Sequence, residues 1–215
     1  YFAVSIGTEN YMNLQDYFRL EGFAYRLVPI KTTDTLGNIG YVDTDILYEN
    51  LMNKFTWGRM NEPDVLIDNH NLRVFSMMKL REVFFRLADA LIVENKTEKA
   101  IQVLDKIVTL TPHEQVPYDY NMIMIAEGYY RTGQDKKANS ILLKIADIYE
   151  KDLNYYLSLK GRNARFTSYE TKVAISVLQE VLNLTEEYKQ EQLYEKISAS
   201  FESLVQRYMG SEQSK

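Results

Sequence analysis

The chain has 215 residues, of which 46% are hydrophobic and 26% are charged. This composition is typical of a globular protein with a buried core, and it excludes a disordered chain and a collagen. The sequence contains no Cys, which excludes a disulfide scaffold and thiolate metal sites. Its longest apolar runs, such as Tyr1–Ile6, are far shorter than the roughly 20 residues that span a bilayer.

The net charge of −5 is concentrated at one end of the chain. Residues 1–71 contain ten Asp or Glu and five Lys or Arg, whereas residues 72–215 contain twenty of each. An acidic N-terminal part argues against a nucleic-acid partner, which would require a basic stripe. An anionic membrane surface would repel this part, weakly at physiological salt.

The first 42 residues predict short strands joined by turns. We expect one strand at Tyr1–Ile6 and a second at Phe23–Val28, each followed by a residue that favours turns. Between them, Asn13–Phe18 predicts a single helical turn, and residues 31–42 predict a loop. Because two strands alone are marginally stable in water, they must pack on other elements.

From Asp43 onward the apolar residues follow a helical period. Asp43 or Thr44 can cap a short amphipathic helix, and Asp68–Asn71 offers N-caps for a long helix over about 72–94. Further helices are expected near 98–110, 119–131, 135–158, 169–183 and 187–209. Short connections between them predict antiparallel helical hairpins.

Capping residues are also expected at two later N-termini. Thr167 and Glu170 have the spacing of a capping box. Thr185 precedes two glutamates, which predicts a cap and a favourable charge at the start of the last helix.

Two of the expected hairpins repeat one pattern. The first contains Phe84-x2-Leu87-Ala88-x2-Leu91, then Ala100-x3-Leu104 and Pro112. The second, shifted by 38 positions, contains Met122-x2-Ile125-Ala126-x2-Tyr129 and Ala138-x3-Leu142, so the two alanines of each copy are separated by the same interval. A small residue lets the two helices of a hairpin approach closely, while the large residues fill the space around them.

This pattern resembles the tetratricopeptide repeat, W-x2-L-G-x2-Y…A-x3-F…P. It departs from that repeat in its period of 38 rather than 34, in Ala for Gly, and in Glu150 at the position of Pro112. A third hairpin, 169–209, keeps the helical period but not the spacing, and would be a divergent repeat or a cap. Generic helical hairpins are the alternative interpretation.

The resemblance to tetratricopeptide repeats implies a concave surface lined by the first helix of each hairpin. The side chains that it places in this groove are Glu82, Phe85, Asp89, Ile92, Tyr120, Ile123, Glu127, Tyr130 and Arg131. Aromatic rings with mixed charges suit a peptide or protein segment as the partner. Alternatively, the terminal helix of the chain itself fills the groove.

The N-terminal segment carries a second resemblance, in Tyr1-Phe-Ala-Val-Ser5, Asn13-Leu-Gln-Asp-Tyr-Phe18 and the run from Leu20 to Ile30. It is similar to a family of multi-spanning membrane proteins of Bacteroidetes-type bacteria that are related to protein O-mannosyltransferases. The resemblance implies a membrane span upstream of Tyr1 and a location on the extracytoplasmic (periplasmic) side of the inner membrane. It also implies glycosyl transfer from a lipid-linked donor, performed by membrane-embedded residues outside this sequence.

Two acidic clusters are candidates for metal binding. Asp43-Thr-Asp45 is a D-x-D, which in nucleotide-sugar transferases holds a divalent metal and a diphosphate, but Asp and Thr before a helix are also natural caps. Asp64 and residues 68–71, which include His70, offer oxygen and imidazole ligands. They lack the Gly and the terminal Glu of a calcium loop, so a turn with an N-cap is the favoured interpretation.

Lys160, Arg162 and Arg165 flank Gly161 in a connection between helices. They could bind phosphate or lipid head groups, although a solvated loop is the favoured interpretation. The sequence contains no phosphate-binding glycine motif and no nucleophile motif. We therefore expect no catalytic residues, no metal and no cofactor in this chain.

Together these patterns predict a mainly α fold, with tetratricopeptide-like antiparallel hairpins in an α–α superhelix and a small β-containing N-terminal subdomain. The expected domains are residues 1–71, and residues 72–215 with hairpins near 72–110, 119–158 and 169–209. Because the chain begins within an apolar segment, we expect it to be part of a longer protein, and the second resemblance implies that this protein spans a membrane. The predicted function is non-catalytic protein interaction or substrate positioning; the alternative is an accessory domain of a glycosyltransferase that uses a lipid-linked sugar.

Overall fold

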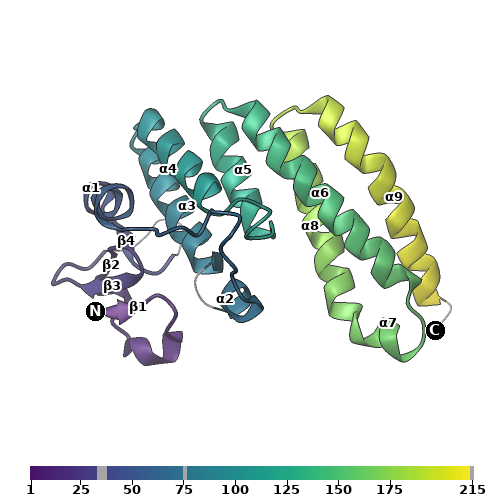
Figure 1. Ribbon diagram of the computed structural model, residues 1–215, viewed down its shortest axis with the longest axis horizontal. Helices are drawn as coiled ribbons and strands as arrows, with labels where there is room; N and C mark the ends of the chain where they lie inside the picture. Colours follow the sequence, from purple (N-terminus) through teal and green to yellow (C-terminus); the bar gives the residue numbers. More distant parts are fainter. Residues whose placement is uncertain (33–37, 75–76, 214–215) are drawn as a thin grey trace. The chain divides into compact units, whose positions relative to one another are not determined.

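The computed structural model describes residues 1–32, 38–74 and 77–213 (Figure 1). In the described residues nine α-helices, α1–α9, accompany one four-stranded sheet near the N-terminus, which confirms the predicted mainly helical class. The chain divides into two compact units, Tyr1–Pro117 and Tyr118–Lys215. Compactness does not say which segments fold alone, so the predicted boundary between residues 71 and 72 stays a prediction.

The sheet of the first unit is small and has the strand order β1-β3-β2-β4. Its strands are β1 (Phe2–Ala3), β2 (Phe18–Leu20), β3 (Ala24–Leu27) and β4 (Tyr41–Val42). The pairs β1–β3 and β2–β3 are antiparallel, whereas β2 and β4 pair in parallel. The sheet is therefore held together mainly by pairings between segments that are distant in the sequence.

The structure corrects three predictions for this region. The strand predicted at Tyr1–Ile6 is only Phe2–Ala3 long. The helical turn predicted at Asn13–Phe18 is the 3-10 helix η2 (Gln15–Tyr17), and Phe18 begins strand β2. The predicted loop 31–42 contains strand β4, while its residues 33–37 lie outside the described residues. The second predicted strand, Phe23–Val28, is confirmed as β3.

Aromatic rings fill the interior beside the sheet. Phe18 and Tyr25, on the paired strands β2 and β3, stack with their centroids 5.4 Å apart. Phe2 and Tyr11 pack on Phe18 at 4.8 and 5.2 Å. Phe18 is fully buried, and Tyr11 and Tyr25 nearly so. Burial of such large rings, with favourable ring geometry, gives a sheet of two- to four-residue strands the apolar core that it needs.

The short helix predicted after Asp43 is α1 (Thr44–Tyr48), which continues as the π-helix η3 (Glu49–Lys54). After η3, Trp57 packs on Phe84 of α3 (Met77–Val93), with their centroids 5.3 Å apart. The indole nitrogen of Trp57 donates to the carbonyl of Leu51, 3.1 Å away. This aromatic contact joins the N-terminal elements to the first helical hairpin.

The first hairpin consists of α3 and α4 (Thr97–Leu110), which pack along each other. The single helix predicted over 72–94 falls on α2 (Asn69–Val74) and α3, and its residues 75–76 lie outside the described residues. Two buried arginines of α3 bind backbone carbonyls of neighbouring connections. Arg81 donates to Val116 at 2.9 Å, and Arg86 to Ile39 at 2.8 Å. These bonds fix both connections to α3.

The second unit contains α5 (Asn121–Arg131), α6 (Asp135–Ser158), α7 (Arg162–Phe166), α8 (Ser168–Glu187) and α9 (Glu191–Gln213). The long helix α6 packs against α5, α8 and α9. The helices predicted near 119–131 and 135–158 are confirmed with nearly the same ends. The short helix α7 has no counterpart in the prediction, which left residues 159–168 as a loop.

Two predicted caps of the second unit are wrong. Thr167 makes no side-chain cap bond; its hydroxyl donates to the carbonyl of Asn163, 3.2 Å away, because α7 ends immediately before it. Thr185 lies inside α8, fully buried, and its hydroxyl donates to the carbonyl of Leu182 at 2.8 Å. Helix α8 therefore extends to Glu187, and α9 begins at Glu191 rather than 187.

Three connections between antiparallel helices have the same backbone geometry. Asn95, Gly133 and Lys189 each have a positive φ, of 60°, 72° and 55°. The next amide in each case donates to a carbonyl five residues back: Lys96 to Leu91, Gln134 to Tyr129 and Gln190 to Thr185, each at 2.8 Å. Together with the bonds from the positive-φ residues themselves, these are Schellman motifs.

The two alanine pairs of the sequence repeat are fully buried. Ala88 and Ala100 have no exposed surface in the α3–α4 hairpin, and neither have Ala126 and Ala138 in the α5–α6 hairpin. The corresponding positions around the third turn are Leu182 and the partly exposed Tyr194. The first two hairpins therefore share both turn and buried small residues, whereas the third shares only the turn.

Candidate functional site

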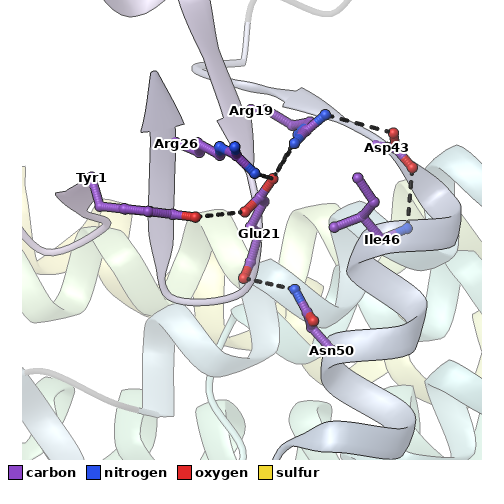
Figure 2. A network of polar contacts seen from close by, with 7 residues as sticks. All are labelled: Tyr1, Arg19, Glu21, Arg26, Asp43, Ile46 and Asn50. Carbon is purple, nitrogen blue, oxygen red and sulfur yellow. Dashed lines mark hydrogen bonds and ion pairs between the residues drawn. The ribbon is translucent and has the colours of Figure 1, made fainter. Parts of the chain in front are cut away.

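A polar network surrounds Glu21, whose side chain is 10% exposed (Figure 2). Its carboxylate accepts a bond from the Arg19 Nε at 2.7 Å and one from the Tyr1 hydroxyl at 3.3 Å. The Arg26 guanidinium lies 3.7 Å away, and the Asn50 amide donates to the Glu21 carbonyl at 3.3 Å. A mostly buried carboxylate with this many partners is electrostatically satisfied. The network joins the sheet to η3.

The structure places the D-x-D residues at the start of α1. Asp43 accepts a bond from the amide of Ile46 at 3.1 Å, which confirms it as the N-cap (Figure 2). Its second carboxylate oxygen lies 4.0 Å from Arg19. Asp45 faces Lys96 of the α3–α4 turn at 3.4 Å. The two carboxylates thus have separate structural partners and do not converge as a pair of metal ligands would.

The acidic residues near His70 also have separate structural roles. Asp64 forms a bidentate pair with Arg59 at 2.7 and 2.8 Å. Asp68 accepts bonds from the amides of His70 and Asn71 at 2.9 and 3.1 Å, and so caps α2. Donation from these amides lowers the pKa of Asp68, although desolvation opposes it. Within the described part of the chain, no cluster of three or more His, Asp or Glu side chains could hold a metal ion.

A cavity of about 480 Å³ opens in the first unit between the N-terminal segment and α3. This volume lies within the range of about 300–1,000 Å³ that is typical of small-ligand sites. Its lining combines backbone, two tyrosines and one ion pair: residues 4–8, Tyr11, Tyr25, residues 38–39, Lys79 and Glu82. The cavity therefore offers a positively charged hydrogen-bond donor, Lys79, and a negatively charged acceptor, Glu82, beside the rings of two tyrosines.

Charge and burial define the chemistry of this cavity. Lys79 and Glu82, one helical turn apart on α3, form an ion pair at 2.9 Å, with side chains 40% and 39% exposed. Desolvation lowers the pKa of Lys79, but its hydrogen bond to Glu82 and the charge of Glu82 outweigh this effect and raise it overall. Burial raises the pKa of both Tyr11 and Tyr25. At neutral pH the cavity thus holds an ammonium group and neutral phenols.

Four of the nine predicted groove residues lie on α3, at spacings of three and four residues that place them on one face of the helix, and all four are half-buried. Glu82 lines the cavity beside the N-terminal segment. Phe85, Asp89 and Ile92 are half-buried along the same helix. The sequence predicted that Glu82 belongs to a groove lined by the first helices of the hairpins; the cavity that it lines with the N-terminal segment is a different feature.

The other five predicted groove residues belong to the second unit. Tyr120 is 45% exposed immediately before α5, and Glu127 and Arg131 lie 3.9 Å apart on α5. Ile123 and Tyr130 are buried. The Tyr130 ring stacks on Tyr188 with the centroids 4.6 Å apart, and its hydroxyl donates to Asn139.

Tyr130 is therefore occupied by contacts inside its own unit. Because α3 and α5 belong to different units, the groove that would combine the nine residues stays a prediction.

Sequence reasoning missed the cavity because its walls come from distant parts of the chain. Tyr11 is the last residue of a 3-10 helix, η1 (Thr8–Tyr11), and no apolar period marks it. Lys79 and Glu82 are three residues apart, which is the spacing of an ordinary surface ion pair. The pairing of β1 with β3 brings the segment after β1 near Tyr25, which a sequence pattern does not show.

The comparisons connect the N-terminal part of the chain to a family. A family model described as TMEM260-associated domain 2 matches residues 1–46, which include all four strands and the N-cap of α1. This family is linked to an O-mannosyltransferase-like membrane protein. No curated protein and no solved structure matches the chain. Among the described helices, none has both the length and the apolarity that a bilayer crossing requires.

Proposed function

We propose that this chain is a non-catalytic domain of a larger membrane protein, in which it binds a protein segment or positions a substrate. The match of residues 1–46 to TMEM260-associated domain 2 is the observation that carries the proposal. The cavity supports it, because most of the lining residues come from this matched segment. A ligand for this cavity would present both an acceptor for Lys79 and a donor for Glu82.

Substitution of the cavity ion pair tests this proposal. In the parent protein, Lys79→Met with Glu82→Gln removes both charges and leaves the net charge unchanged. Crosslinking to a bound protein segment or substrate should then be lost. Lys99→Met with Glu98→Gln, on the exposed start of α4, is the matched control and should retain the crosslink. Equal crosslinking of the two variants would contradict the cavity as the binding site.

We further propose that α3–α4 and α5–α6 are tetratricopeptide-like repeats. The buried alanine pairs and the two Schellman turns, at the same spacing of 38 residues, support this assignment. The predicted groove residues would then act as a second contact surface for a peptide.

Ala100→Arg tests the packing on which the repeat depends. The substitution should lower the free energy of unfolding by several kcal/mol, about 3–5, through overpacking and an unpaired buried charge. Glu98→Arg, two residues away and exposed, is the control and should change it by less than about 0.5 kcal/mol. If the Ala100→Arg variant unfolds at the same urea concentration as the unsubstituted 215-residue chain, close approach of the two helices at this residue is ruled out.

The second candidate function is an accessory extracytoplasmic domain of a glycosyltransferase that uses a lipid-linked sugar. The link of the matched family to an O-mannosyltransferase-like membrane protein favours it. In this case the domain would lie on the periplasmic side and present an acceptor to a membrane-embedded active site. Removal of residues 72–215 from the parent protein should lower sugar transfer in isolated membranes. Unchanged transfer would leave only the interaction function.

Cell fractionation tests whether this chain belongs to a membrane protein, independently of which of the two functions it has. An antibody to this chain should detect a species in the membrane pellet that is much larger than 25.2 kDa. In spheroplasts, external protease should cleave the domain if it is extracytoplasmic. A soluble species with only the mass of this chain would contradict the membrane parent, and protection from the protease would contradict the periplasmic side.

A further inference from the structure

The connection between α6 and α8 ends the second unit in an exposed aromatic and basic surface, which we call the α7 tip. Its members are Tyr155, Lys160, Arg162, Arg165, Phe166 and Tyr169. Figure 1 shows α7 at the end of the α6–α8 pair, near the C-terminal end of α9. All six side chains are exposed, and Tyr155, Phe166 and Tyr169 are 62%, 67% and 74% exposed. Most aromatic side chains of this unit, in contrast, are at least partly buried.

The local fold keeps these side chains outside the core. Gly161 adopts a φ of 60° before α7, and no neighbouring atom would meet a side chain there. Helix α7 is only five residues long and contains no buried residue. Arg162 lies over the Phe166 ring, 5.1 Å from its centroid, so the cation and the ring are exposed together. The α7 tip is thus a protruding turn of the chain.

The charge of the α7 tip is opposite to that of the rest of the chain. Residues 153–169 contain three Lys or Arg and no Asp or Glu, a net charge of +3. Since the whole chain has a net charge of −5, the remaining residues carry −8. No described carboxylate side chain lies within ion-pair distance of Lys160, Arg162 or Arg165. A fourth cation, Arg207 of α9, reaches the same end and donates to Asn154 at 2.6 Å.

We propose that the α7 tip is a docking surface for an anionic lipid bilayer. Lys and Arg side chains near such a surface are attracted to its headgroups, and Tyr and Phe side chains partition into the interface between headgroups and acyl chains. A protruding turn can present both kinds of side chain to a flat surface at once. An acidic protein segment would use the cations but would leave three large exposed rings in water.

This inference goes beyond the proposed function, which requires no contact with lipid. The net charge of the whole chain is negative and by itself predicts repulsion from anionic membranes, so the inference depends on the local charge of the α7 tip. Repulsion between charges in solution is screened within about 8 Å at physiological salt. The three cations of the α7 tip therefore act on the lipid more strongly than distant carboxylates do when the tip is nearest the bilayer, although Asp152 and Glu170 flank the tip and reduce its local charge. The resulting contact is expected to be weak and reversible.

Vesicle sedimentation tests the proposal with the 215-residue chain. The anionic vesicles mix two parts of phosphatidylcholine with one part of phosphatidylglycerol, and the neutral vesicles are phosphatidylcholine alone. The chain should bind the anionic vesicles in about 50 mM salt, bind them less at about 500 mM, and not bind the neutral ones. Lys160→Gln with Arg162→Gln and Arg165→Gln should weaken binding by about 100-fold, since each cation contributes about five-fold. Phe166→Ser with Tyr169→Ser should weaken it by roughly ten-fold.

The matched control removes the same charge at the other end of the unit. Lys136, Lys189 and Lys196 are exposed residues near the α5–α6 and α8–α9 turns. Their combined substitution by Gln should leave binding to anionic vesicles within about three-fold of the parent, because they lie far from the tip along α6 and α9. Circular dichroism of each variant shows that the helices are retained. Equal loss in both triple variants would reduce the effect to net charge and overturn the proposal.

A fluorescent substitution provides a second measurement that does not depend on loss of binding. Phe166→Trp adds an indole at the centre of the α7 tip, and its emission should shift to shorter wavelength on addition of anionic vesicles. Trp57 of the first unit contributes background emission, which is measured separately with the unsubstituted chain. An unshifted emission, or binding to soluble poly-glutamate in preference to vesicles, would assign the tip to an acidic protein segment and contradict lipid docking.

Discussion

At the scale of single residues, the backbone of Lys189 is in a conformation that L-residues avoid. It occupies the left-handed position of a Schellman turn, where the equivalent turn of the preceding hairpin has Gly133. A side chain there costs about 1 kcal/mol, and Gly removes that cost. Lys189→Gly should therefore raise the free energy of unfolding by about 0.5–1 kcal/mol relative to Lys189→Ala, which keeps the Cβ atom. Urea denaturation measures the difference, and equal stability of the two variants would contradict the assigned conformation.

Two tyrosines, the buried Tyr130 and the half-buried Tyr149, make the second unit sensitive to alkaline pH. Desolvation, with a smaller contribution from the Asp119 carboxylate, raises the pKa of Tyr149 to about 12, and desolvation also raises the pKa of Tyr130. An unfolded tyrosine ionises near pH 10. Between pH 10 and 12 the unfolded chain thus releases protons that the folded chain keeps. The free energy of unfolding should fall in this window, by at most about 1.4 kcal/mol per pH unit for each tyrosine.

Substitution by phenylalanine isolates this contribution. Tyr149→Phe should flatten the decline in stability between pH 10 and 12, while stability below pH 9 changes little. Tyr169→Phe, at a side chain that is 74% exposed, is the control and should leave the slope unchanged. Denaturation curves at several pH values provide the measurement. The same slope in the parent and in Tyr149→Phe would show that this phenol ionises equally easily in both states.

At the scale of elements, the Asp43 cap controls a short helix that is packed on its neighbours. The carboxylate of Asp43 satisfies the amide of Ile46, and Thr44 and Leu47 of α1 are buried. Asp43→Ala should lower the free energy of unfolding by about 1 kcal/mol, whereas Asp43→Asn, which also caps well, should lower it by at most a few tenths. Chemical denaturation with and without magnesium checks this. Stabilisation of the parent chain by the metal, lost in Asp43→Asn, would instead favour the D-x-D interpretation.

The elements that could be predicted are those whose cause is local. Apolar residues at helical spacing correctly predicted α4, α5 and α6, and Asp43 and Asp68 act as caps as expected. Strands β2 and β4 could not be predicted, because strands of three and two residues show no period in the sequence and form only by pairing, β2 with both β3 and β4, and β4 with β2. The predicted cap at Thr185 was wrong because burial, and not the local pattern of polar residues, keeps α8 helical there.

The candidate sites also combine residues that the sequence could indicate with surroundings that depend on distant parts of the chain. Glu82 was assigned to a groove by the repeat resemblance. The cavity that Glu82 lines could not be predicted, because its opposite wall comes from residues 4–8 and Tyr25, which no helical period connects to α3. The cations of the α7 tip were visible in the sequence, and a solvated loop was the favoured interpretation. What the sequence could not show is that Phe166 and Tyr169 are exposed beside them.

At the scale of the whole molecule, the strand order has a consequence for how the chain folds. The pairs Phe2–Tyr25 and Arg19–Tyr41 join residues 23 and 22 positions apart, whereas each Schellman turn closes over five. Closing a longer loop costs more chain entropy, and this cost comes before the new contacts can offset it. Proteins with many contacts between distant residues therefore fold more slowly. In refolding followed by pulsed hydrogen exchange, the Ala138 amide should become protected before the Val4 amide, which bonds to Phe23. The opposite order would mean that the sheet forms before the α5–α6 hairpin; the expected order means that the family-matched segment matures after that hairpin.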